Sequence, residues 1–124
     1  MNILFVVAGS LAVFVLAYYT YGRFLSEKVF ALDDGRRTPA VELNDGLDYV
    51  PAGTAMLLPQ HFSAIAAAGP INGPIIAGLM FGWAPALLWI ILGSIFIGGL
   101  HDMGSLVASV RHGARSITDV IRAN

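Results

Sequence analysis

Residues 66–75 read Ala-Ala-Ala-Gly-Pro-Ile-Asn-Gly-Pro-Ile, with two Gly-Pro pairs four residues apart. Each proline lacks a backbone N–H and clashes in a helix with the carbonyl four residues before it. The residue before a proline is also disfavoured in helical geometry, and here it is a glycine both times. We therefore expect a helix in this region to be broken at Gly69–Pro74 into two half-helices, about 62–68 and 74–81.

The surrounding sequence is too apolar for a water-soluble domain. Of 124 residues, 56% are hydrophobic and 12% are charged, and the mean hydropathy is +0.72; soluble domains carry about a quarter charged residues. No Asp, Glu, Lys or Arg occurs in the 52 residues from Tyr49 to Leu100. A net charge of −1 provides no positive electrostatic field that would attract nucleic acid. The absence of cysteine excludes disulfides and thiolate metal sites. The sequence predicts an all-α integral membrane protein whose surroundings are membrane lipid.

Three transmembrane helices fit the apolar runs, each long enough for a hydrocarbon core of about 30 Å. The spans are predicted at about 3–21, 62–81 and 84–110. A cleaved signal peptide is the alternative for the first run, but no positive charge precedes it. Turn-forming residues Gly82-Trp83-Ala84-Pro85 separate the second and third spans.

Polar residues 22–60 are predicted to form a cytoplasmic loop, with a short helical continuation of the first span to about Ala31. Residues 113–124 start a further segment, because Ser116 and Asp119 have capping-box spacing. Lys and Arg gather in these two regions and are absent before the first span and between the last two. The positive-inside rule therefore predicts an N-terminus outside and a C-terminus in the cytoplasm.

A break inside a membrane span is a candidate transport site. Unwound backbone at that depth must line a cavity or be buried in protein, because lipid cannot bond its polar groups. In secondary transporters such breaks hold substrates and ions. We assign Gly69, Pro70, Asn72, Gly73 and Pro74 to a candidate substrate or ion path. The alternative is a proline kink that only shapes packing.

Three other residues are candidates for proton linkage. His101 and Asp102 are neighbours, and Asp102 lies about 13 Å before Arg111 along a helix axis. Ionisable groups within a membrane usually line a functional path. An interfacial position for the pair is an equally good interpretation. His61 is a weaker candidate, at the expected cytoplasmic mouth of the second span. No further His or carboxylate has metal-ligand spacing, so we expect no metal.

Ordered blocks of sequence resemble one known family. The blocks are Asn44–Pro51, His61–Pro74, Gly82–Trp89, Gly98–Asp102 and Ser109–Ile117. Together they cover nearly the whole chain, and they resemble the carbon starvation protein A (CstA) family. Its members are several times longer, so the chain is similar to their N-terminal part.

The resemblance implies a function. It implies a bacterial inner-membrane transporter of many spans, used in carbon starvation, which imports peptides or pyruvate by proton symport. Its partners would be a small carboxylated substrate, protons and the remaining transporter helices. No hydrolase motif is present, so we expect neither an enzyme nor a cofactor. The alternative is a small membrane adaptor that binds partner helices through the small residues of its third span.

Overall fold

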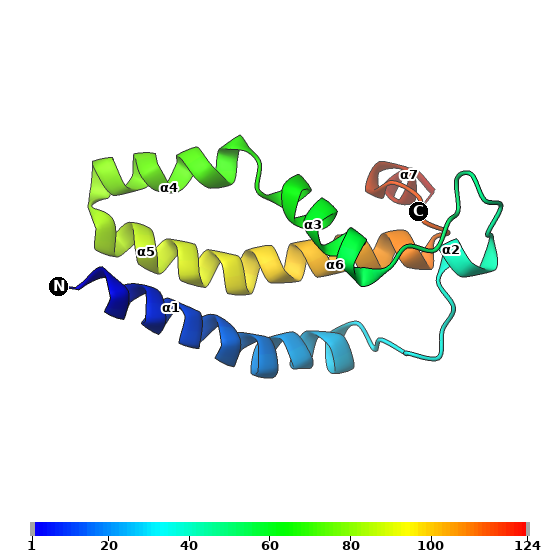
Figure 1. Ribbon diagram of the computed structural model, residues 1–124, viewed down its shortest axis with the longest axis horizontal. Coiled ribbons are helices and arrows are strands. Elements are labelled where there is room, and N and C mark those ends of the chain that lie inside the picture. The colour runs from blue at the N-terminus through cyan, green and yellow to red at the C-terminus, as the bar shows by residue number, and fades with distance from the viewer. Residues whose placement is uncertain (1, 124) are drawn as a thin grey trace. The chain divides into compact units, whose positions relative to one another are not determined.

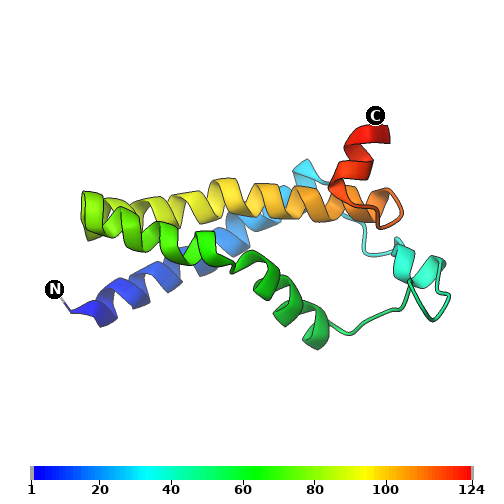
Figure 2. The ribbon, with the colours of Figure 1, turned by 90° about the horizontal axis from the view of Figure 1, so that it is seen from above.

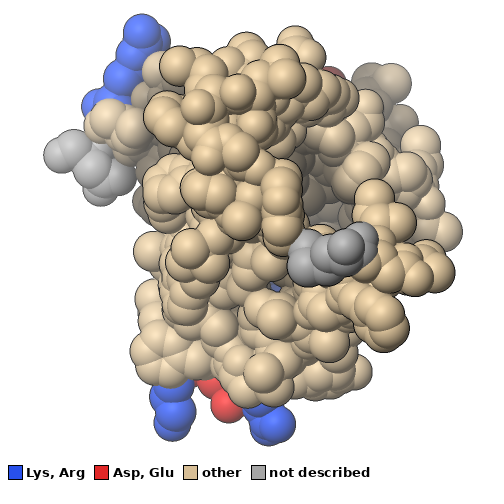
Figure 3. Space-filling view, turned by 90° about the vertical axis from the view of Figure 1, so that its left-hand side faces the viewer, with Lys and Arg blue, Asp and Glu red and all other residues tan. Residues whose placement is uncertain are grey.

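The computed structural model describes residues 2–123, and side chains up to residue 122. Every regular element in this range is a helix, which confirms the predicted all-α class. The chain divides into two units, one of Met1–Arg36 with Ile91–Asn124 and one of Arg37–Ile90. In the end-on view of Figure 3, charged side chains are visible mainly at the margins.

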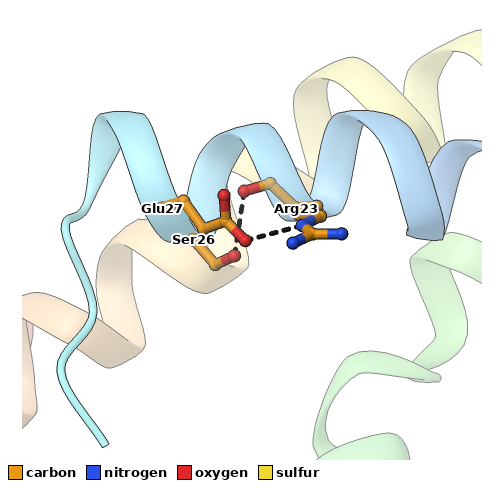
Figure 4. A network of polar contacts seen from close by, with 3 residues as sticks. All are labelled: Arg23, Ser26 and Glu27. Atoms are coloured by element: carbon orange, nitrogen blue, oxygen red, sulfur yellow. Dashed lines mark hydrogen bonds and ion pairs between the residues drawn. The ribbon is translucent and has the colours of Figure 1, made fainter.

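The first span is a helix of 27 residues, Ile3–Val29. It consists of α1 (Ile3–Ala17) and the π-helical stretches η1 (Tyr18–Gly22) and η2 (Leu25–Val29), shown in blue to cyan in Figure 1. The helix extends beyond residue 21, the predicted end of the span, because the short helical continuation expected to about Ala31 is present up to Val29. Arg23 Nε donates to Glu27 Oε1 at 2.6 Å, and Ser26 Oγ donates to the Arg23 carbonyl at 3.0 Å (Figure 4). These contacts within one helix supply polar partners where the apolar run stops.

The second span is broken, but not where the sequence predicted. Helices α3 (Thr54–Ile65) and α4 (Ala68–Phe81) meet at 49°. The break lies at residues 66–67, whereas Gly69–Pro74 is helical throughout. The residue four positions before Pro70 is Ala66, so the missing N–H and the ring clash act on the turn before this proline. The predicted unwound segment 69–74 was therefore wrong, while the break itself is present.

The broken span also starts earlier than residue 62. Gly53 is extended, with ψ 152°, and precedes the first turn of α3, which bonds back to its carbonyl. The polar loop predicted at 22–60 is correspondingly shorter, since helix occupies residues up to Val29 and from Thr54 onward. The loop contains one short helix, α2 (Pro39–Glu42).

The third span is a continuous helix of 29 residues, Trp83–Arg111, close to the predicted 84–110. It comprises α5 (Trp83–Leu92), the π-helical η3 (Gly93–Gly98) and α6 (Gly99–Arg111). Gly82 separates it from α4 with φ +88°, a left-handed value that favours glycine. The predicted divider between the two spans is thus confirmed.

Within the first unit, the first span and the η3–α6 part of the third run in the same direction and cross at an angle (Figures 1 and 2). Tyr21 packs edge-on against Phe96 with ring centroids 5.0 Å apart. Further along, the Arg111 guanidinium donates to the carbonyls of Phe30 and Ala31. The ends of these two helices, which carry the basic residues, therefore adjoin each other.

After α6, the chain turns through Gly113, with φ +74°, into α7 (Ile117–Ala123). Ser116 Oγ donates to Asp119 Oδ2 at 2.6 Å and accepts from the Asp119 N–H at 3.2 Å. Ser116 therefore caps α7 at the predicted position, while the Asp119 carboxylate bonds the Ser116 hydroxyl instead of completing a capping box. Asn124, the last residue of the segment predicted at 113–124, lies outside the described residues.

Candidate functional site

The start of α4 places a helix N-terminus inside an apolar span. α4 has 14 residues and so rises about 21 Å from the Gly82 turn, less than the hydrocarbon thickness of about 30 Å. Its N-cap, Ala67, is extended and provides no side-chain hydrogen bond. The first N–H groups of a helix have no partner within it, and they carry the positive end of the helix dipole. The arrangement can attract an anionic group or a water molecule.

Three of the predicted site residues share one face of α4. Gly69, Asn72 and Gly73 are spaced three and four apart, which places them side by side on a helix. The Asn72 side chain is exposed and has no hydrogen-bond partner among the described residues. A Cβ added at either glycine would meet nothing within 4 Å. A ligand could therefore approach the backbone on both sides of the Asn72 amide.

Pro70 and Pro74 lie on the neighbouring face of the same helix. Pro70 is in the first turn of α4, where its missing N–H costs no helical hydrogen bond. Pro74 lies in the helix interior and removes one bond there. Pro70 therefore determines where α4 begins, and Pro74 weakens its first turns.

His61 lies within α3, before the break, and its side chain is exposed. The sequence had placed it ahead of the second span, because that span was predicted to start at residue 62. His61 is thus in the other half-helix from the Asn72 face.

His101 and Asp102 form a pair on α6, in the other unit. His101 Nδ1 lies 3.0 Å from Asp102 Oδ1, and their side chains are 76% and 37% exposed. The two neighbours thus contact each other directly. Imidazole and carboxylate groups form the proton relays of membrane transporters, and here the two are in direct contact.

Sequence reasoning missed the contact between the ends of the first and third spans. In the sequence, Arg111 only marked a position near the end of the third span, yet its guanidinium reaches residues 30 and 31. Only its position at the end of a span hinted at such a role. As for metals, the described residues contain no cluster of three or more His, Asp or Glu that could hold an ion.

The sequence model of the family described as carbon starvation protein CstA matches residues 2–124. The chain belongs to the CstA family. Among curated relatives, the peptide transporter CstA of Helicobacter pylori (strain ATCC 700392 / 26695) is 43% identical over 98% of this chain and 18% of the relative. The peptide transporter CstA of Escherichia coli (strain K12) is 40% identical over 98% of this chain and 17% of the relative.

A further CstA-family relative has a different name. The pyruvate/proton symporter BtsT of Escherichia coli (strain K12) is 40% identical over 96% of this chain and 16% of the relative. The chain spans between 16% and 20% of the length of the curated relatives that it matches. No solved structure matches it. Membership of this family, together with its apolar helices, makes the chain part of a multi-pass protein of the bacterial inner membrane.

Proposed function

We propose that this chain forms the N-terminal part of a secondary transporter that imports peptides or pyruvate in the response to carbon starvation, with protons as the coupling ion. Relatives of about 40% identity carry the names peptide transporter and pyruvate/proton symporter. The observation that carries the proposal is the helix break at residues 66–67, which leaves the N-terminus of α4 without a side-chain cap inside an apolar span. Broken helices of this kind bind carboxylates in secondary transporters.

The proposed substrate site consists of the α4 N-terminus and the face bearing Gly69, Asn72 and Gly73. The N–H groups would bind the carboxylate that peptides and pyruvate share, and the Asn72 amide would bind a second polar group. Pro70 holds the N-terminus in place, and Pro74 keeps the following turn deformable. None of these steps requires a cofactor or catalysis.

The substrate site is tested by uptake in cells that carry the complete protein. Asn72→Ala is expected to lower uptake of labelled pyruvate or a labelled dipeptide, because the proposed polar partner of the substrate is lost. Ile71→Ala, one residue away on another face of α4, is the matched control and should retain uptake. If both variants transport like the parent at equal expression, the Asn72 face is not the substrate site.

Proton coupling is proposed for His101 and Asp102. An exposed imidazole–carboxylate pair within a span would be costly against lipid, so in the complete protein it must face protein or water. His61, in α3, is a secondary candidate for proton linkage.

The test of coupling is uptake driven by a pH gradient in proteoliposomes. Asp102→Asn should abolish dependence on the gradient and leave exchange of substrate across the membrane intact. Asp48→Asn, in the polar loop, is the charge-matched control. Unchanged gradient dependence in Asp102→Asn would remove the pair from the mechanism without touching the substrate site.

We also propose that the N-terminus lies outside and that both basic regions are cytoplasmic. The contact of Arg111 with residues 30 and 31 supports a shared side for the two regions, and the positive-inside rule gives the direction. A single cysteine at Leu47, which is 88% exposed, should react with an impermeant maleimide only in inverted vesicles. Reaction in right-side-out cells would reverse the topology.

A further inference from the structure

An unfilled groove runs along the crossing pair of helices in the first unit. It has a volume of about 620 Å³. One wall belongs to the first span, between Phe14 and Ser26, and the other belongs to η3 and α6. Its lining includes Ala17, Tyr21 and Gly22 on the first wall and Ser94, Gly99 and Met103 on the second.

Each wall of the groove contains a glycine, Gly22 in the first span and Gly99 in α6. A Cβ added at Gly22 would meet only Ala17 and Tyr18 of its own helix, at 3.8 and 4.0 Å. A Cβ at Gly99 would meet only the carbonyl of Ser94, at 3.5 Å. No side chain from the opposite wall fills the space above either glycine. The backbone of both helices is therefore open to close approach.

Two polar groups at the groove already bond within their own helix. The hydroxyl of Ser26 donates to the carbonyl of Arg23, and the Arg23 guanidinium bonds Glu27. The rest of the lining is mainly aliphatic and aromatic. Such walls disfavour a water-filled path, because exposed apolar surface is costly in water.

All three π-helical stretches border the groove, since η1, η2 and η3 each contribute lining residues. A π turn is wider than an α turn, is rare, and is found mostly at functional positions. Because three π-helical stretches border the same groove, we interpret the groove as a binding surface and not as a packing defect.

We propose that an apolar transmembrane helix from the remaining part of the complete protein seats in this groove, with its backbone over Gly22 and Gly99. Small residues are what allow helices to approach closely in membranes, where burial from water gives no driving force. The curated relatives are at least five times the length of the region matched here, so further helices are available in the family. This inference is independent of the cargo and of proton coupling.

The test is thiol labelling of the complete protein. The chain has no cysteine, so Ala17→Cys and Met103→Cys can each be made the only thiol once cysteines elsewhere are replaced by serine. A seated helix predicts loss of labelling at both positions by a water-soluble and by a lipid-soluble maleimide, with full labelling after denaturation in SDS. Leu47→Cys, in the loop, is the positive control and should label in the folded protein.

Either other result overturns the proposal. Labelling by the water-soluble reagent would make the groove an aqueous path. Labelling by the lipid-soluble reagent alone would make it a lipid site.

A second pair of variants avoids reliance on thiols. Gly22→Leu should lower the Tm of the complete protein because the side chain would displace the seated helix. Gly9→Leu, on the same span but outside the groove lining, is the matched control. Leu is a better helix former than Gly, so an equal or raised Tm for both variants would count against an occupying helix.

Discussion

The carboxylate of Asp45 organises the polar loop on its own. Its Oδ1 accepts backbone N–H groups of Leu47, Asp48 and Tyr49, each at 2.9 Å. The following Gly46 has φ +76°, so a side chain there would be strained. Hydrogen bonds from Tyr49, Leu47 and Asp48 lower the pKa of the Asp45 carboxyl from its ordinary 3.8, because they favour the charged form.

A lowered folded-state pKa fixes the direction of the pH dependence. The stabilising contribution of Asp45 is complete above pH 3.8 and is lost as the pH falls through the lowered pKa. We expect the amides of residues 47–49 to lose protection from hydrogen exchange over that acid range, after correction for intrinsic rates. Asp45→Ala should remove this protection at neutral pH as well.

Asp48→Ala is the control for the loop, because it removes a neighbouring carboxylate and keeps the Asp45 acceptor. Equal protection in Asp45→Ala and in the parent would mean that the loop is held by other contacts.

At the scale of elements, Pro70 sets the break in the second span. Pro70→Ala restores an N–H that can bond the carbonyl of Ala66, and it removes the ring clash. We expect the 49° bend to decrease and the distance between spin labels at Met56 and Met80 to increase. Both positions are well exposed, and pulsed electron paramagnetic resonance measures the distance.

Two other prolines act as controls for this experiment. Pro74→Ala and Pro59→Ala change the interiors of α4 and α3, so the bend should persist in both. A bend that survives in Pro70→Ala would assign the break to the packing of neighbouring helices.

The helices and turns could be predicted from the sequence where residues close together in the chain determine them. The spans, the turn at Gly82 and the Ser116 N-cap follow from hydropathy and from residues within four positions of each other. The break was expected for the right reason, yet it was placed within the Gly-Pro repeat instead of before its first proline. The pairing of His101 with Asp102 depends on side-chain rotamers, which spacing alone does not determine.

For the molecule as a whole, contacts distant in sequence determine how the spans associate, and no local pattern gives them. Phe30 lies over Gly104, where an added Cβ would be 3.4 Å from its ring, and Arg111 bonds the carbonyls at the end of the same helix. The sequence predicted only that the two regions share a side of the membrane. Which side chains meet there required the structure.

The contact between the two spans can be weakened from either helix. Arg111→Ala should lower the free energy of unfolding by about 1 kcal/mol, the size of a typical net hydrogen-bond contribution. Gly104→Leu should displace Phe30 and lower it as well. Because both changes act on one contact, the double variant should lose less than the sum of the two single changes. Denaturation in mixed micelles measures all three.

Gly104→Ala is the mild control, since 3.4 Å is an ordinary contact distance. Strictly additive losses in the double variant would show that Arg111 and Phe30 act independently.

The partners in this contact are 80 and 81 residues apart in the chain, which affects biogenesis. At about 5–20 residues per second, a ribosome needs roughly 4 to 16 s between the synthesis of Phe30 and that of Arg111. Throughout that interval the end of the first helix has no arginine to bond its carbonyls. Chaperones or insertion factors of the nascent chain have this period in which to shield it.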